Sequence, residues 1–433
     1  MAIFSTTAKG LQNSIDKMCL FYASLGLEIS LKKTKIIIFN KSGKLLKGYN
    51  FVCNGTVLEV TNEYQYLGLK LTPSGSMTLA TNELCAKASR AWFSISNIIY
   101  TNKRMPVKRA MELFDSLVTP VALYASEFWL PCLMQKKCFS SVDNIFSFWE
   151  AMKCETINQR LCRMLLSVHS KASRLAVLGE LGRYPLHVRA LQHCLAYRHS
   201  LASKPSDSPV ALAMAEMAVW AGQGRDCWLG RVDTIGQLLK VSRPNPRSAG
   251  KVIGRQIKSG FDRFWLDQIS LVKPGPDGNN HNKLRTYSSF KASFTVEPYF
   301  ECVLNRSQRA DLTRLRVSAH LLGIERLRYA RPPVPPAQRG CRFCGPPGPR
   351  VAIGSPGRGP CDDEQHAITV CSLMADEREQ LYRDMSVSCP AFQSLTCQEK
   401  FVRLMCPVNA TESKLVNRFI SKTFLKRNFI DEN

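Results

Sequence analysis

The chain has 433 residues with 45% hydrophobic content, which is enough for packed cores and excludes an intrinsically disordered protein. Its 59 lysines and arginines against 34 aspartates and glutamates give a formal net charge of +25, which favours a polyanionic partner, nucleic acid before a membrane surface. The 17 cysteines, an odd number without a preceding signal peptide, exclude a disulfide framework and predict a protein of the nucleus or cytoplasm that is not secreted.

The first 39 residues predict a strand end, a helix, a basic turn and a buried strand. Residues 1–5 are expected to be the tail of a strand, and residues 11–25 a helix with one apolar face. Gly26 can end this helix, and the β-branched run 36–39 has the composition of a buried strand. A strand entered through lysines favours a sheet edge that faces phosphate. The lysines of the turn are Lys32, Lys33 and Lys35.

A second stretch, residues 63–71 with the sequence EYQYLGLKL, alternates apolar and polar residues and predicts another strand. Its glycine, Gly68, marks a bulge or a close approach of the backbone to another group. Taken one at a time, the basic turn and this strand are ordinary elements, so their order and spacing carry the functional information.

Together, GLEISLKKTKIIIF at 26–39 and EYQYLGLKL at 63–71 resemble the end of the palm in reverse transcriptases of non-LTR retrotransposons, the LINE class. In that family a Lys-Thr pair lies beside the phosphates of the incoming nucleotide, and a Tyr-Leu-Gly strand belongs to the hairpin that grips the primer end. One departure is Ser30, where many members have asparagine. The resemblance implies nucleotide binding by Lys33 and Thr34, primer binding by Tyr66, Leu67 and Gly68, and nucleic-acid contacts by Lys32 and Lys35.

In the resembled family the metal-binding Tyr-x-Asp-Asp hairpin comes immediately before a segment like residues 1–5. Polymerisation by two metal ions needs carboxylates that converge on both ions. The acids before Gly75 include no adjacent pair, so we assign no catalytic residue and expect Mg²⁺ only in the intact parent polymerase. We also expect a fragment whose N-terminal polymerase half is missing. These acids are Asp16, Glu28, Glu59 and Glu63.

From residue 79 the apolar period becomes helical, and a second helix is expected at 107–118, after Pro106. In the resembled family this position is the helical thumb that follows the template–primer duplex. The resemblance therefore implies that Lys87 and Arg90 contact phosphates, which positions a duplex without reading its sequence.

The resemblance continues through LYASEFW at 123–129, where Ala125 replaces the glycine of the family motif, and through LGELGRYPL at 178–186. The apolar window 117–134 is broken by two prolines and Glu127, so it predicts a buried core segment and no transmembrane span. Residues 203–311 read as a variable connector without an assigned role, and residues 210–220 within it as a buried helix.

The strongest chemical signal is a set of metal-ligating residues near the C-terminus. Cys-x-x-Cys places two thiolates on one tight knuckle, and His-x-x-x-x-Cys can add a nitrogen and a third sulfur, which completes a tetrahedral zinc site. A closed site of this kind is structural because no position is open for a substrate. Cys361 is an alternative ligand. The predicted ligands are Cys341, Cys344, His366 and Cys371.

A segment just before these cysteines loosely matches one that precedes the cysteine cluster of the resembled elements. Its glutamate comes one residue early. The matching residues are Arg316, His320, Leu322 and Glu325. By this resemblance Arg316 is a nucleic-acid contact. We interpret His320 as a packing residue or an RNA contact, not as a metal ligand.

We predict an α+β protein with an incomplete antiparallel palm sheet (1–75), a helical thumb (76–202), a helical connector with loops (203–311), and a basic segment with a zinc knuckle and C-terminal helices (312–433). The implied function is that of the C-terminal part of a LINE-like RNA-directed DNA polymerase, which binds template and primer, RNA and DNA, and is inactive alone. The alternatives are a non-catalytic nucleic-acid-binding zinc protein and an inert retroelement remnant. No membrane partner is expected.

Overall fold

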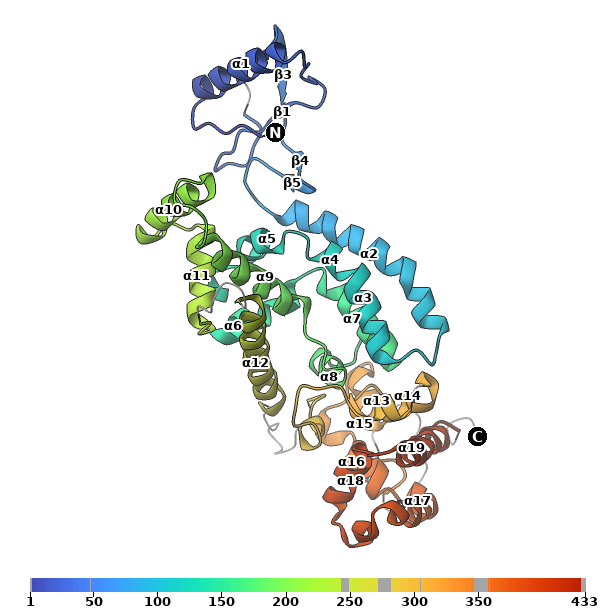
Figure 1. The fold of residues 1–433 in the computed structure, drawn as a ribbon. Helices are drawn as coiled ribbons and strands as arrows, with labels where there is room; N and C mark the ends of the chain where they lie inside the picture. Colours follow the sequence, from blue (N-terminus) through green and yellow to red (C-terminus); the bar gives the residue numbers. More distant parts are fainter. Residues whose placement is uncertain are drawn as a thin grey trace.

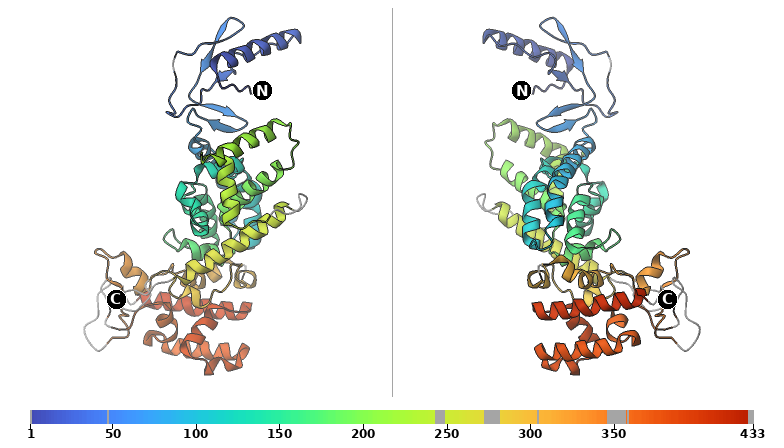
Figure 2. Two further views of the ribbon diagram at one scale, coloured as in Figure 1. Left: turned by 90° about the vertical axis from the view of Figure 1, so that its left-hand side faces the viewer. Right: turned by 90° about the vertical axis from the view of Figure 1, so that its right-hand side faces the viewer.

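The computed structural model describes residues 2–46, 48–242, 249–271, 282–303, 305–345, 357 and 359–429. The chain is elongated, with the strands and α1 at one end, a helical middle part, and the C-terminal helices at the other end (Figures 1 and 2). The predicted α+β class is confirmed. None of the described helices combines the length and the apolar composition needed to cross a membrane.

The N-terminal sheet is small and mixed. Helix α1 (Ala8–Ser24) begins at Thr7, whose side chain accepts a hydrogen bond from the Gly10 N–H. The strands are β1 (Lys35–Ile36), β2 (Phe51–Cys53) and β3 (Thr56–Val60), in the order β1-β3-β2. Strands β2 and β3 form an antiparallel hairpin through Asn54-Gly55, whose φ angles of 49° and 76° suit a two-residue turn.

Three details of this region differ from the sequence prediction. The buried strand predicted at 36–39 is not formed as such, because β1 ends at Ile36 and Phe39 is 55% exposed. Strand β1 pairs with β3 in parallel, so the sheet is not purely antiparallel. After β1 the chain first forms β2, and the hairpin turn then brings β3 back beside β1 in the same direction. Residues 2–5 form no strand, because the Ser5 hydroxyl bonds locally to Thr7 at the entry of α1. The core beneath the sheet is correspondingly small: Ile15, Cys19, Ile36, Phe51, Cys53 and Leu58.

A second hairpin connects the sheet to the helical part. It consists of β4 (Tyr64–Tyr66) and β5 (Leu69–Leu71), which pair in antiparallel fashion. The turn between them is Leu67-Gly68, and both residues have positive φ angles, 46° and 82°. A two-residue turn with two positive φ angles matches the twist of the flanking strands.

The middle part begins with α2 (Thr78–Thr101), which lies beside β5 and buries one face at helical spacing, as predicted (Figure 1). Its buried residues include Leu84, Ala88 and Trp92, and Trp92 meets Phe114 edge to face. The helices that follow are α3 (Val107–Leu117), α4 (Thr119–Ala122), α5 (Ser126–Leu133), α6 (Val142–Ser147), α7 (Glu155–Leu166), α8 (Arg174–Glu180) and α9 (Leu186–Leu201).

Helix α9 packs between α5 and α12 (Ala249–Ser270) and forms the centre of the middle part. The segment expected to be a buried helix at 210–220 is indeed helical, as α10 (Pro209–Gly222), but none of its residues is buried. That part of the prediction is wrong, because α10 packs mainly against α11 (Trp228–Leu238) and leaves its other faces uncovered.

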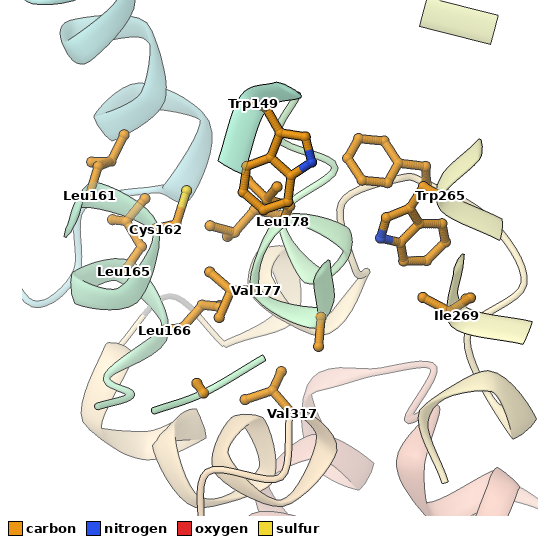
Figure 3. Packing of buried hydrophobic residues seen from close by; sticks show 14 of the residues in the cluster. Trp149, Leu161, Cys162, Leu165, Leu166, Val177, Leu178, Trp265, Ile269 and Val317 are labelled. Atoms are coloured by element: carbon orange, nitrogen blue, oxygen red, sulfur yellow. The ribbon is translucent and has the colours of Figure 1, made fainter. Parts of the chain in front are cut away.

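One contiguous hydrophobic core extends from α2 to the C-terminal helices. Its members Trp149, Leu178, Trp265 and Val317 come from distant parts of the sequence and converge in the interior (Figure 3). The C-terminal helices are α13 (Tyr299–Cys302), α14 (Ala310–Arg316), α15 (Gly323–Arg326), α16 (Glu364–Thr369), α17 (Ala375–Ser388), α18 (Cys397–Met405) and α19 (Ala410–Phe429). Helix α19 lies against both α14 and α17.

Candidate metal centre and basic pocket

The predicted ligand residues converge on one point. The ligand atoms of Cys341, Cys344, His366 and Cys371 all lie within 4.8 Å of one another. Three of the four residues are buried and Cys344 is half-buried. Cys361 is not a member of this group, so the structure brings together the four residues that the spacing predicts and not the alternative ligand.

The local sequence explains why these side chains meet. Asp363 is the N-cap of α16 and accepts a hydrogen bond from the His366 N–H at 2.8 Å, which places the histidine in the first turn. After this short helix, the Cys371 N–H donates to the His366 carbonyl at 2.8 Å. Gly359 holds the Cys-x-x-Cys knuckle, because its N–H donates to the Cys341 carbonyl at 3.0 Å. A larger residue would not fit at this position, since its Cβ would lie only 2.7 Å from the same carbonyl oxygen.

The donor atoms fit a tetrahedral metal ion. The Cys371 sulfur lies 3.9 Å from that of Cys341 and 3.6 Å from that of Cys344. Metal–sulfur bonds of about 2.3 Å at tetrahedral angles separate two sulfurs by about 3.8 Å. The Nε2 atom of His366 is buried and has no hydrogen-bond partner among the described residues. A buried nitrogen without a partner is costly unless it has a ligand, so the Cys3His group could hold a metal ion.

Arg427 of α19 completes the surroundings of this group. Its Nη2 atom donates to the Cys371 sulfur at 3.1 Å, and its Nη1 atom donates to Asp362 Oδ1 at 2.5 Å. The contact with the Cys341 thiol is the main cause that lowers the pKa of Cys371 to about 3, and the His366 side chain and then the Arg427 charge lower it further. The pKa of Cys341 is raised, first because of the same contact. These contacts favour the thiolate form of Cys371, which is the form that binds metals.

Arg316 is not available as a nucleic-acid contact, and that prediction is wrong. The side chain is fully buried and forms a two-pronged ion pair with Glu180, at 2.9 and 2.8 Å, and a second ion pair with Glu297 at 2.7 Å. Burial raises the pKa of Glu180, but the charge and hydrogen bonds of Arg316, together with the Lys291 charge and the hydrogen bond from Tyr299, outweigh burial and leave that pKa lowered overall. Every donor group of the guanidinium faces protein, so no phosphate can reach it.

His320 is likewise a packing residue. Its Nε2 atom lies 2.7 Å from Glu364 Oε1, and its side chain is buried. Glu364 also pairs with Arg285, which bonds to Glu325 at 2.8 Å. His320 and Glu325 therefore belong to a buried charge network with Arg285 and Glu364. This network holds α16, the helix that carries His366, in place.

The two stretches with the palm resemblance meet in an open pocket of about 400 Å³. The Tyr64 hydroxyl donates to the Lys33 carbonyl at 3.1 Å and joins the basic turn to β4. The pocket is lined by Lys32, Lys33, Lys35, Thr61, Glu63, Tyr64, Gln65 and Lys70.

The four lysines of the pocket differ in their charge partners. Lys35 is paired with Glu59, and Lys70 is paired with Glu63 and, at 2.7 Å, with Glu83. Lys32 and Lys33 are exposed, and no ion pair of the described residues includes them. These two cations are the ones that can meet an anion in the pocket. The neighbouring Thr34 hydroxyl is engaged locally, because it donates to the Ser30 carbonyl at 2.9 Å.

The other predicted contact residues lie outside this pocket. Tyr66, Leu67 and Gly68 form the tip of the β4–β5 hairpin, where the Tyr124 hydroxyl donates to the Leu67 carbonyl at 2.7 Å. A Cβ on Gly68 would come within 3.2 Å of the Tyr124 ring, so the predicted close approach is confirmed, although the glycine is in a turn and not in a bulge.

Lys87 and Arg90 lie on α2 and do not line the pocket. Lys87 is half-buried, and Arg90 is exposed. The structure thus brings the basic turn and β4 together and leaves the hairpin tip and the α2 cations as separate surfaces.

The chain is similar to a curated protein. Over 126 residues it is 27% identical to an uncharacterized, transposon-derived protein of Caenorhabditis elegans; the match covers 29% of this chain and 43% of that protein. The matched stretch therefore spans less than half of the relative's length. No protein-family model and no solved structure matches the chain.

Sequence reasoning missed two residues that position these sites. Arg427 comes 56 residues after Cys371, and nothing in the spacing of a lone arginine signals a contact with a thiolate. Tyr124 lies within the LYASEFW motif, yet the motif alone does not reveal that its hydroxyl holds a turn 57 residues earlier.

Proposed function

We propose that this chain is the C-terminal part of a LINE-type retroelement reverse transcriptase and binds template and primer nucleic acid. The single observation that carries the proposal is the pocket lined by Lys32, Lys33, Lys35 and Lys70, which we call the lysine pocket. There the basic turn meets β4, and these two elements come from the two stretches that carry the family resemblance. The similarity to a transposon-derived protein and the net charge of +25 support the same conclusion.

In this proposal the two exposed lysines receive phosphates. Lys32 and Lys33 have no acidic partner among the described residues, whereas Lys35 and Lys70 hold the pocket wall through ion pairs. Contacts to phosphate fix the position of a nucleic acid without reading its sequence. Arg90 on α2 offers a further exposed cation for the same strand or duplex.

Zinc is the metal that we propose for the Cys3His group. Three thiolates and one imidazole at tetrahedral separation are the donor set of structural zinc sites. Because the site joins the knuckle to α16 and, through Arg427, to α19, its binding energy would help to fold the C-terminal part. Four protein ligands leave no open position, so the ion would have no direct part in catalysis.

The test is the affinity of the purified chain for a labelled RNA–DNA hybrid, measured by fluorescence anisotropy. Replacement of both Lys32 and Lys33 by alanine is expected to weaken binding by about tenfold or more, because two charge-assisted contacts are lost. The matched control replaces the exposed Lys204 and Lys414, which lie far from the pocket in sequence. Unchanged binding in the Lys32/Lys33 variant, or no binding by the unmodified chain, would refute the proposal.

A further inference from the structure

The outward face of α2 exposes two aromatic rings. Phe93 and Tyr100 are 65% and 63% exposed, whereas the opposite face of the helix is buried in the core. They are seven residues apart, which is about two helical turns or about 10.5 Å along the axis, so both rings lie on one face. Arg90 and Asn97 are exposed on the same face, beside the rings.

The surroundings of these rings are strongly basic. Residues 87–109 contain six cationic side chains and no aspartate or glutamate. Five of the six are exposed. Among the residues that the structure describes, only the last of the six has an ion-pair partner: Arg109 pairs with Glu112 in an exposed ion pair, and such pairs contribute little. The six are Lys87, Arg90, Lys103, Arg104, Lys108 and Arg109.

The end of α2 is held in place from a distant part of the chain. The Arg306 guanidinium lies 5.6 Å from the Tyr100 ring and donates to the Tyr100 carbonyl at 2.8 Å. The Arg306 N–H also donates to the Lys103 carbonyl at 2.9 Å. Tyr100 and the turn with Lys103 and Arg104 are therefore held in place before any ligand binds, which lowers the entropy cost of binding.

The combination of aromatic rings and cations indicates which class of ligand this face can bind. An apolar protein partner would not require six clustered cations, and a double helix hides the faces of its bases in the stack. An unpaired strand offers both phosphates and open base faces, and proteins bind such strands with a basic surface and exposed aromatic rings. The spacing of about 10.5 Å corresponds to about three base steps of 3.4 Å.

We propose that the α2 face formed by Arg90, Phe93, Asn97 and Tyr100 binds an unpaired nucleic-acid strand, with Phe93 and Tyr100 stacking on bases. This inference rests on the proposed function and makes it more specific, because it assigns single-stranded nucleic acid, and not a duplex, to this face. The cations of residues 87–109 receive the phosphates of the same strand.

The test compares a labelled single-stranded oligonucleotide with a blunt duplex of the same sequence, by fluorescence anisotropy on the full chain. Replacement of Phe93 and Tyr100 by leucine keeps apolar volume and removes the aromatic faces. We expect single-strand binding to weaken by about tenfold or more for each ring, and duplex binding to change by less than about threefold. Replacement of Phe4, which is 83% exposed and outside the basic stretch, is the control.

The outcomes separate this inference from the proposed function. If the Phe93/Tyr100 variant binds the single strand as the unmodified chain does, while the Lys32/Lys33 variant loses binding, the inference is wrong and the proposed function stands. If both forms of nucleic acid lose affinity equally in the Phe93/Tyr100 variant, the preference for an unpaired strand is wrong. If the unmodified chain binds neither form, the proposed function fails and the inference fails with it.

Discussion

Arg427 connects α19 to the Cys3His group through hydrogen bonds to two sulfurs, that of Cys371 at 3.1 Å and that of Cys341 at 4.0 Å. The guanidinium also pairs with Asp362, so its position is fixed from two sides. Groups that donate to a metal-bound thiolate orient the ligand and moderate its charge, and their loss costs about 10- to 100-fold in metal affinity. The structure therefore assigns a positioning role to a residue far from the ligands in sequence.

We predict that replacement of Arg427 by glutamine weakens zinc binding by about 10- to 100-fold, measured by competition with a chromophoric chelator. Arg418 lies on the same helix and is exposed, so its replacement by glutamine is the matched control and should leave the affinity unchanged. Equal zinc affinity for both variants would show that the contact between Arg427 and Cys371 has no effect on the site.

The buried ion pair between Arg316 and Glu180 supports a second prediction. Removal of one partner leaves an uncompensated buried charge, which costs about 3–5 kcal/mol. We expect Arg316→Met to lower the free energy of unfolding by about this amount in urea denaturation. The double variant with Glu180→Leu should recover part of the loss, although Glu297 then also lacks its cation. A single variant as stable as the unmodified protein would contradict the role of this pair.

His187 of α9 is fully buried, and burial lowers its pKa to about 4 from an ordinary value of 6.5. Between these two values the unfolded chain binds a proton that the folded chain does not, so stability falls as the pH falls from about 6.5 to 4, by about 3 kcal/mol in total. In the His187→Gln variant an amide can still donate to the Ile145 carbonyl. Its urea stability should depend less on pH over this range; an unchanged pH dependence would count against the argument.

At the scale of the element, the β4–β5 hairpin carries strain in its turn. Leu67 has a φ of 46°, although its side chain is 73% exposed and gains little from packing. A branched residue in this conformation costs about 1 kcal/mol or more, and asparagine is favoured there in two-residue turns. Strain that persists in an exposed residue is typical of a functional site.

We therefore predict that Leu67→Asn raises the free energy of unfolding by about 0.5–1 kcal/mol and weakens binding of a primer–template. The control Val57→Asn changes an exposed apolar residue in a regular strand, so it should bring no gain in stability. Thermal unfolding and anisotropy measure the two effects. A variant that is more stable and binds equally well would show that the Leu67 side chain has no role in binding.

The helices illustrate what the sequence could and could not predict. The apolar period of α2 predicted the buried face, because burial repeats with the helical turn. The same kind of argument failed for α10, since an apolar helix is buried only if other elements cover it, and coverage is a tertiary property. Metal-ligand spacing predicted the Cys3His group because four donors of fixed chemistry constrain one another.

The LGELGRYPL motif shows the limit most clearly. Its residues contact partners far away in sequence: Glu180 pairs with Arg316, Arg183 with Asp115, and the Tyr184 hydroxyl with Asp262. The family resemblance implied that Arg316 is a nucleic-acid contact, but Glu180 of this motif is its buried ion-pair partner. No local pattern reveals that a cation has a buried partner 136 residues away.

At the scale of the whole molecule, exposed lysines and arginines lie near both ends of α2. The lysine pocket, with Lys32 and Lys33, lies near the start of α2. The turn with Lys103 and Arg104 follows the end of α2. A nucleic acid that contacts both would run along the helix that connects the N-terminal sheet to the main core (Figure 1). Binding would then depend on many phosphate contacts, each of which releases counterions.

The most direct test of this account is the dependence of RNA–DNA hybrid affinity on salt concentration. We predict a linear decrease of log K with log salt, with a slope that becomes shallower by about 2 when Lys32 and Lys33 are both replaced by alanine. An affinity that does not change with salt, or an equal slope for the two proteins, would contradict the claim that this chain holds nucleic acid at the lysine pocket.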